Sequence, residues 1–206
     1  MKTINKTIVL LLTLSLLIPI AASAKGGKRS ARNKSQTVVT VLTVEQQETL
    51  FWMREEEKLA RDVYLALYDQ WDVAVFKNIA NSEQKHMNAI LRKIKTFGLT
   101  DPAVAAEGEF TNPDLQQLYT NLVIQGEDSY INALIVGATI EDLDIADLID
   151  AIEDTDNLSL KMTYQNLLEG SKRHLRAFTS LMKEQGVEYT PEYIEQDLYD
   201  AILVGI

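Results

Sequence analysis

The sequence contains no cysteine among its 206 residues. Thiolate metal sites and a disulfide framework are therefore excluded, and a metal ion can be held only by oxygen and imidazole ligands. The lack of a thiol is compatible with export, because an oxidising compartment would find no thiol to oxidise. Histidine is also scarce, since the chain has only His86 and His174.

Several common sequence patterns are missing as well. The chain shows no strand-like alternation of consequence, no glycine-rich phosphate-binding loop and no nucleophile–base arrangement. Apolar residues recur instead at steps of three and four, which is the spacing of one buried helix face. The sequence therefore predicts an all-α fold.

Residues 1–24 have the parts of a secretory signal peptide. Lys2 and Lys6 precede an apolar run over residues 8–20, and small residues directly before Lys25 give a cleavage site. The alternative is an uncleaved membrane anchor, which would need about 20 apolar residues, and this run is shorter. We therefore expect export to the periplasm or the extracellular space, with a mature chain that begins at Lys25.

Residues 25–41 form a basic arm with no helical apolar pattern, which we interpret as flexible. The arm could contact an anionic envelope surface, and a solvated linker is the alternative. Aromatic residues do not interleave with the charges, so nucleic-acid binding has no support. The formal net charge of −10 becomes −12 without Lys2 and Lys6, and this acidic balance can attract cations.

Residues 42–206 are long enough for one domain with a sizeable core. Capping and breaker residues predict helices over about 44–70, 74–98, 113–126, 127–154, 158–186 and 191–203. Short turns join the first two helices and also the fourth and fifth, so each pair should be antiparallel. The predicted fold is an antiparallel four-helix bundle with a long crossover between its second and third main helices and a short C-terminal helix.

Each main helix has polar residues in the middle of its apolar stripe, namely Glu57, Glu83 with His86, Glu141, and Ser171 with His174. Glu57 and His86 should lie at the same height, roughly 21 Å from the turn that joins their helices. A buried unpaired carboxylate is so unfavourable that it becomes neutral, finds a partner or binds a metal. The polar layer therefore predicts either a metal site or a hydrogen-bonded core network.

Other polar residues near this layer have simpler interpretations. Glu55 and Glu56 lie off the stripe of Glu57, so we expect them to face solvent or to pair with Lys and Arg. Tyr64 and Tyr164 are expected in the core, each with its hydroxyl group hydrogen-bonded, and the alternative is an oxidisable tyrosine or one beside a metal ligand.

Three segments resemble known metal-binding helices. Residues 57–64, with Glu57, Ala60, Arg61 and Tyr64, resemble the first-helix motif of rubrerythrins. Residues 76–86, FKNIANSEQKH, resemble their second-helix Glu-x-x-His segment, and residues 140–144 resemble their third-helix pair of carboxylates. As a whole, residues 42–203 resemble an uncharacterised ferritin-like family known as domain of unknown function 2202.

The resemblance implies a ferritin-like bundle that binds one or two iron ions, with manganese as an alternative. The matching metal-ligand positions are Glu57, Glu83, His86, Glu141 and His174, with Asp144 as a candidate sixth ligand. One departure is that Ser171 occupies the position of a fourth-helix carboxylate, while Glu169 lies about 140° round that helix from His174. The other is that no cysteine-rich electron-transfer module follows the bundle, so redox chemistry would need an external electron donor.

The leading hypothesis is an exported metalloprotein in which Glu57 and Glu141 bridge two irons that oxidise Fe(II) or react with dioxygen or peroxide. The alternative is a non-catalytic interaction or structural module of the cell envelope, with the polar layer as a core network. The loss of one carboxylate at Ser171 favours the alternative, and the coincidence of four polar positions favours the metal. The sequence leaves the oligomeric state open, a dimer included.

Overall fold

The computed structural model describes residues 41–205, which form six helices and no strand. The helices are α1 (Val44–Trp71), α2 (Ala74–Thr96), α3 (Pro113–Asp128), α4 (Tyr130–Asp154), α5 (Leu158–Glu184) and α6 (Gln196–Val204). None of the helices in this part of the chain is long and apolar enough to cross a membrane. The predicted signal peptide and nearly all of the basic arm lie outside the described residues.

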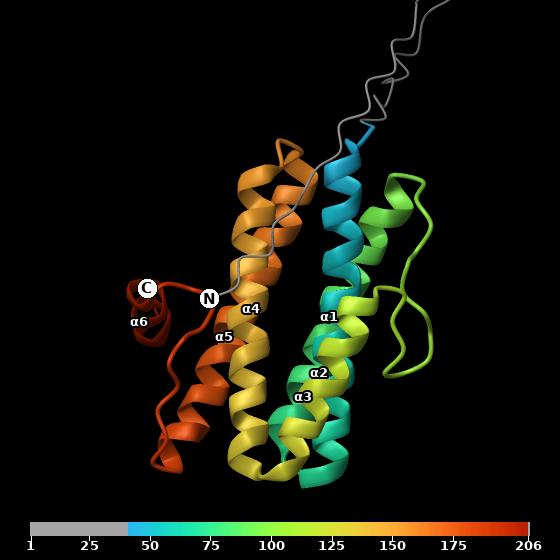
Figure 1. The fold of residues 1–206 in the computed structure, drawn as a ribbon. Coiled ribbons are helices and arrows are strands. Elements are labelled where there is room, and N and C mark those ends of the chain that lie inside the picture. The colour runs from blue at the N-terminus through green and yellow to red at the C-terminus, as the bar shows by residue number, and fades with distance from the viewer. Residues whose placement is uncertain (1–40, 206) are drawn as a thin grey trace, which may run out of the picture. The chain divides into compact units, whose positions relative to one another are not determined.

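The four longest helices lie side by side as two antiparallel pairs, α1 with α2 and α4 with α5 (Figure 1). A capping box begins α1, because Thr43 Oγ1 accepts a hydrogen bond from the Gln46 backbone N–H and the Gln46 side chain accepts one from the Thr43 N–H. A left-handed residue, Asp72 at φ 50°, ends α1 and allows the sharp turn into α2. The Asn157 side chain caps α5 after another short turn, over residues 155–157.

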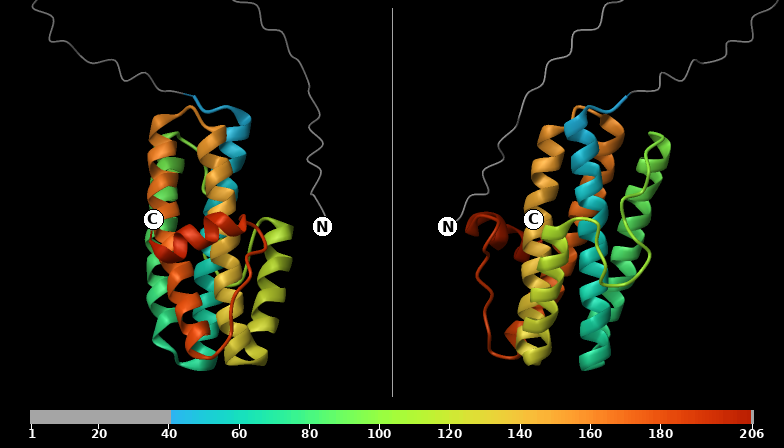
Figure 2. Two further views of the ribbon diagram at one scale, coloured as in Figure 1. Left: turned by 90° about the vertical axis from the view of Figure 1, so that its left-hand side faces the viewer. Right: turned by 45° about the vertical axis from the view of Figure 1, so that its right-hand side comes forward.

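The two pairs meet where α1 packs on α4 and α2 packs on α5, while α3 lies against α1 and α4 (Figure 2). The break between α3 and α4 falls at Ser129, one turn after the expected break at Gly126. Ser129 is extended and its Oγ accepts a hydrogen bond from the Asn132 N–H, so it is the N-cap of α4. Gly126 lies within α3, and its missing side chain gives room to Leu67, whose Cδ2 would lie 2.5 Å from a Cβ at this position.

The C-terminal helix also begins later than expected, at Gln196. The buried Asp142 carboxylate of α4 keeps the segment before this helix in a non-helical conformation. That carboxylate accepts hydrogen bonds from the backbone N–H groups of Glu192, Tyr193 and Ile194 at 2.6, 3.1 and 3.0 Å. These N–H groups are therefore bound to a side chain, and the helix starts only after them.

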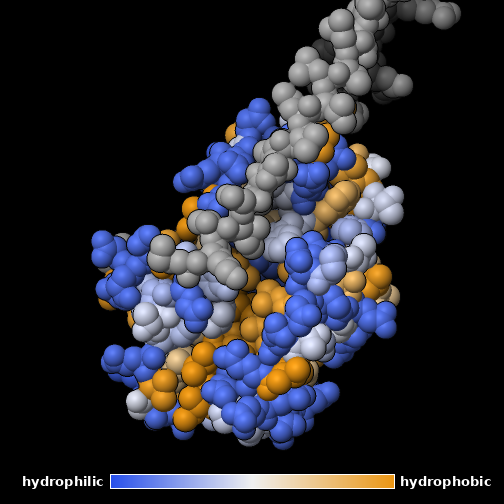
Figure 3. Space-filling view, viewed as in Figure 1, coloured by the Kyte–Doolittle hydropathy of each residue, from blue (hydrophilic) through white to orange (hydrophobic). Residues whose placement is uncertain are grey.

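Buried apolar residues form two clusters, with the polar layer between them. One cluster contains Tyr64, Phe76 and Phe178, and the other contains Leu50, Ile90 and Tyr164, toward the end where α1 and α5 begin. On the face drawn in Figure 3, hydrophobic residues are visible only as patches among hydrophilic ones. The apolar clusters thus stabilise the helices above and below a layer that is polar but buried.

Three charged residues of α1 hold the long connection between α2 and α3. Arg54 makes two hydrogen bonds to Asp101, and Glu55 accepts bonds from the backbone N–H groups of Thr111 and Asn112. Lys58 is 1% exposed and donates to the carbonyls of two residues in the same connection, Ala106 and Glu109. The crossover is therefore fixed to the helix that carries Glu57.

Lys58 also neutralises a buried acid, which gives a test of this arrangement. Its Nζ lies 2.5 Å from Asp62 Oδ2, and Asp62 is fully buried, with Arg61 as a second partner. We expect Lys58→Met to lower the free energy of unfolding by about 3 kcal/mol, the lower end of the range for a broken buried ion pair, because Arg61 remains. Urea unfolding followed by circular dichroism measures this change. The exposed Lys85→Met on α2 is the control, and equal stability of the two variants would contradict the prediction.

Candidate metal centre

The polar layer brings together side chains from four helices. Glu57 comes from α1, Glu83 and His86 from α2, Glu141 from α4 and His174 from α5, and all five are buried. Glu83 and His86 are one helical turn apart, so both face the same side of α2. The five residues that the sequence singled out as principal ligands are therefore neighbours in space.

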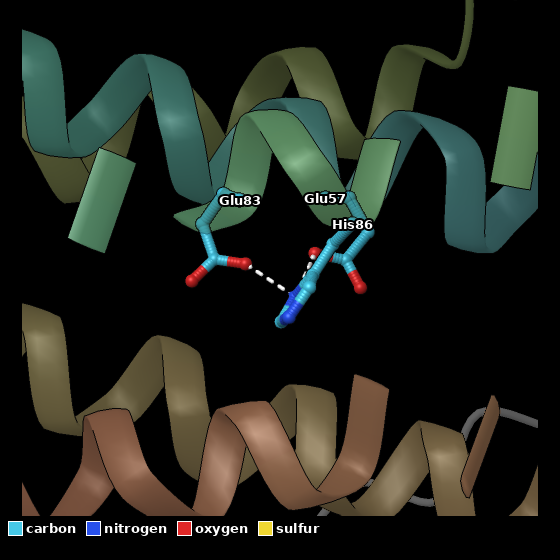
Figure 4. Close-up of side chains that lie close together, drawn as sticks. All are labelled: Glu57, Glu83 and His86. Carbon is cyan, nitrogen blue, oxygen red and sulfur yellow. Dashed lines mark hydrogen bonds and ion pairs between the residues drawn. The ribbon is translucent and has the colours of Figure 1, made fainter. Parts of the chain in front are cut away.

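Glu57, Glu83 and His86 make the first group (Figure 4). The Nδ1 atom of His86 lies 2.7 Å from Glu83 Oε2 and 3.2 Å from Glu57 Oε2. One ligand atom from each residue lies within 4.8 Å of the others, which is close enough for all three to hold one metal ion.

Glu83, Glu141 and His174 make the second group. The Nδ1 atom of His174 lies 2.7 Å from Glu83 Oε1 and 3.4 Å from Glu141 Oε2. The two histidine rings are stacked, with centroids 5.6 Å apart. Glu83 therefore belongs to both groups and has one oxygen beside each imidazole.

Glu83 lies in both groups, whereas Glu57 and Glu141 each lie in one group only. The bridging of two ions by Glu57 and Glu141 therefore stays a prediction, and the structure adds Glu83 as a residue common to both groups. The reason is that Glu83 lies between the two histidine rings, one from its own helix and one from α5.

Burial and mutual interaction shift the pKa values of the layer in opposite directions. Burial disfavours the charged form of Glu83, but hydrogen bonds with His174 and His86 outweigh it and hold the Glu83 pKa below its usual value. Burial would lower the pKa of both histidines, but Glu57 and Glu83 raise that of His86 to about 12, and Glu141 and Glu83 raise that of His174 to about 10. Without a metal, the layer is therefore held together by imidazolium–carboxylate pairs.

Asp144 lies beside the two groups without being a member of either. It is one helical turn after Glu141, and its Oδ2 accepts a hydrogen bond from Ser171 Oγ. Its Oδ1 is buried and has no hydrogen-bond partner. Burial first, and then the charge of Glu141, raises the Asp144 pKa to about 8. The Asp144 carboxylate of α4 thus lies beside Ser171, the α5 residue that occupies the expected position of a carboxylate.

Three further residues support the layer. The sequence predicts a core position with a bonded hydroxyl for Tyr64, or a place beside a ligand, and its hydroxyl donates to Glu141 Oε1 at 2.6 Å. Ser82 Oγ lies 3.0 Å from His174 Nε2. Gly170 leaves room for the His86 ring, because a Cβ there would lie 2.5 Å from its Cε1 and Nε2 atoms. The only sequence signal for Ser82 is its position next to Glu83. The only signal for Gly170 is its position one helical turn before His174.

Other expectations about neighbouring residues were wrong. Glu55 and Glu56 are 4% and 2% exposed, so neither faces solvent or pairs with Lys or Arg in this structure. Both are buried because the crossover covers one side of α1 and α4 covers another. The Tyr164 hydroxyl is buried without a hydrogen-bond partner, although a bonded hydroxyl was expected. As its angle to His174 predicts, Glu169 is exposed and pairs with Lys172, so it does not replace the missing carboxylate.

Fold and site together define an all-helical protein in which four helices bring carboxylates and imidazoles into one buried layer. The chain belongs to the family described as an uncharacterized protein domain, DUF2202, which matches residues 46–205. It is 48% identical over 163 residues to the uncharacterized protein MJ0754 of Methanocaldococcus jannaschii, covering 79% of this chain and 88% of that protein. The crystal structure of hypothetical protein MJ0754 from Methanococcus jannaschii aligns with a TM-score of 0.80 at 47% identity, covering 81% of this chain and 96% of that chain.

The contact between Gly170 and His86 can be tested directly. Gly170→Ala should displace the His86 ring and leave that of His174 nearly in place, because the added Cβ overlaps only the former. With two histidines in the chain, ¹⁵N-histidine labelling and NMR give a separate ring signal for each. Asn166→Ala, at an exposed site one turn earlier on α5, is the control. Unchanged His86 signals in Gly170→Ala would show that the ring is not confined as described.

Proposed function

We propose that this chain is an exported, ferritin-like metalloprotein that binds one or two iron ions, with manganese as the alternative, and uses them to oxidise iron or to react with dioxygen or peroxide. The observation that carries the proposal is the position of Glu83, shared by two buried groups that each combine carboxylates with one imidazole. Metal sites in helical bundles are built from inward-facing glutamates and histidines in this way.

The residues present fit such an ion. Buried oxygens of Glu57 and Asp144 have no hydrogen-bond partner, so they are available as ligands. The three carboxylates of the two groups, Glu57, Glu83 and Glu141, have only His86 and His174 as positively charged partners within these groups. Carboxylate oxygen and imidazole nitrogen together suit iron and manganese, which lie between hard and borderline ions.

The protein residues have separate roles in this proposal. Glu57 with His86 would hold one ion and Glu141 with His174 the other, while Glu83 would contact both. Tyr64 and Ser82 orient Glu141 and His174 through their hydrogen bonds. Bound iron would supply the one-electron chemistry that these side chains cannot perform, and electrons for a reductive cycle would come from an external donor.

Other features support the placement of this protein among exported ferritin-like proteins. Its four longest helices form two antiparallel pairs linked by a long connection, which is the arrangement of ferritin-like bundles. The rubrerythrin-like motifs coincide with the residues of the buried layer. The signal-peptide pattern of residues 1–24 supports export, and the basic arm would then contact an anionic envelope surface.

A second candidate function is a non-catalytic helical module. The observation in its favour is that the layer pairs its own charges, since each histidine contacts carboxylates of two different helices. Such pairing would hold the four helices together without any metal. In this case the polar layer would affect stability alone.

Replacement of the shared carboxylate separates the two candidates. After anaerobic reconstitution with Fe(II), elemental analysis should find one ion for each group in the unmodified chain, and oxygen should then produce an absorption band of oxidised iron. Glu83→Gln should lose most of this iron because it weakens both groups at once. The exposed Glu169→Gln should bind as the unmodified chain does. A folded, unmodified chain that binds no iron, manganese or zinc would refute the metal proposal.

Proton release gives an independent test. The pKa values of His86 and His174 are about 12 and about 10, so both rings are protonated at pH 7 without a metal. A metal ion binds the neutral imidazole, so binding should release a proton from each ring, and affinity should rise as pH increases toward these values. Calorimetry in buffers of different ionisation enthalpy measures the released protons. His174→Gln should release fewer, and binding without proton release would contradict the assignment of the imidazoles as ligands.

A further inference from the structure

A cleft lies at the end of the bundle where α1 begins and α4 turns into α5 (Figure 1), and we call it the end cleft. Its volume is about 780 Å³, which is within the usual range for small-molecule sites. The Gln46 side chain of α1 joins the two sides of this end, because it donates hydrogen bonds to Thr155 and Asp156. The end cleft is separate from the candidate metal centre, since Tyr164 in its wall precedes His174 by about 15 Å along α5.

The inner wall of the end cleft is apolar except for one hydroxyl group. Ala151 and Leu160 are buried there, and Tyr164 is 1% exposed. Side chains on a helix lean toward its N-terminus, so that of Tyr164 points toward the beginning of α5, where the cleft lies. Its hydroxyl has no hydrogen-bond partner among the described residues, although a buried polar group normally has one. Burial raises the Tyr164 pKa, so the phenol is neutral and can donate a hydrogen bond.

The outer wall of the end cleft is acidic. Four carboxylates line the cleft, against the one ammonium group of Lys161. Within residues 41–205, none of the four forms an ion pair. The local field therefore attracts a positively charged ligand. The four acidic residues are Glu45, Glu153, Asp154 and Asp156, all of them exposed.

The C-terminus of α4 adds to this negative potential. The C-cap residues of α1, α2 and α5 each donate a backbone N–H to a carbonyl of the last turn, but Thr155, the C-cap of α4, makes no such bond in the described part of the chain. The last turn of α4 also lacks a basic residue. Its carbonyls can therefore accept hydrogen bonds from a bound N–H donor, and the helix dipole favours a positive charge there. Ala151, Glu153 and Asp154 of this turn all line the cleft.

From these features we infer that the end cleft binds a small organic cation with a primary ammonium group at one end and a hydroxyl group at the other. The ammonium group would lie among the carboxylates and the α4 carbonyls, and the hydrocarbon part would cover Ala151 and Leu160. The ligand hydroxyl would accept a hydrogen bond from Tyr164. A charged group at the inner wall would be buried without a partner, which is unfavourable.

A bare metal ion fits the end cleft less well than an amine. No three carboxylates of the cleft, in the part of the chain that the structure describes, bring ligand atoms within 4.8 Å of one another. The end cleft therefore adds a function to the one proposed above and does not depend on it.

A series of amino alcohols from propanolamine to hexanolamine tests this site. Binding is followed by NMR titration of the ¹⁵N-labelled chain in the presence of a chelator, so that no metal ion takes part. The member that fits best should shift the backbone amide signals of residues 43–49 and 151–161, and its affinity should fall as salt is added. The alkylamine of equal length should bind roughly three- to tenfold more weakly, because it lacks one hydrogen bond. The corresponding alcohol, which lacks the charge, should bind more weakly still.

Variants assign the two ends of the ligand separately. Tyr164→Phe should stay folded, because its hydroxyl makes no hydrogen bond within the described residues. It should lower the affinity for the amino alcohol roughly three- to tenfold and leave that for the alkylamine unchanged. The double variant Glu153→Gln, Asp154→Asn should weaken the binding of both amines. Tyr193→Phe, at an exposed tyrosine, and Glu184→Gln, at the far end of α5, should bind as the unmodified chain does.

The outcomes are independent of those for the metal centre, because the variants leave all five candidate metal ligands in place. Equal affinities for amino alcohol and alkylamine, or no effect of Tyr164→Phe, would overturn the assignment of the hydroxyl end. Signal shifts spread over the whole acidic surface would show unspecific attraction and would overturn the site. Absence of binding by every amine at millimolar concentration would overturn it as well, whatever iron the central groups bind.

Discussion

The position of the Glu83 carboxylate between two imidazoles is the interaction on which the middle of the structure depends. A carboxylate with 1% exposure would be strongly unfavourable without charged partners, and His86 and His174 supply them at 2.7 Å each. Because His174 comes from α5, the same contact joins the two helix pairs at the level where the apolar core is interrupted. The polar layer is therefore both a weak point of the core and the place where the pairs are linked.

The sequence predicts the helices best where the local signal is strong. The capping box at Thr43, the turn at Asp72 and the N-cap at Asn112 all lie at or next to the expected helix boundaries. The signal fails where a distant residue decides the structure. Asp142 delays α6 by binding backbone groups some 50 residues away, and Gly126 gives space to Leu67 of α1 within a helix instead of breaking it.

The same limit applies to the candidate metal centre. Helical spacing brings the five candidate ligand residues to one level, and this was predictable from the 3.6-residue period. The period does not specify the orientation that each side chain adopts within the polar layer. The role of Glu83 as the shared residue, and the pairing of Asp144 with Ser171, depend on distances across helices. The burial of Glu56 was not predicted for a related reason. It depends on the residues of α4 that lie beside Glu56, and the apolar stripe of α1 does not reveal them.

The five consecutive charged residues from Arg54 to Lys58 are all buried, although an ordinary amphipathic helix exposes about half of its circumference. Each has a different neighbour: Asp101, the backbone at residues 111–112, the carboxylates of Asp147 and Asp144, His86 and Asp62. Slippage of α1 by one residue would rotate every charge by about 100° into the environment of another. Lys58 would then leave Asp62, and Glu57 would leave His86. Apolar packing alone tolerates such errors more readily, so this run of charges selects a single register and orientation for α1 during folding.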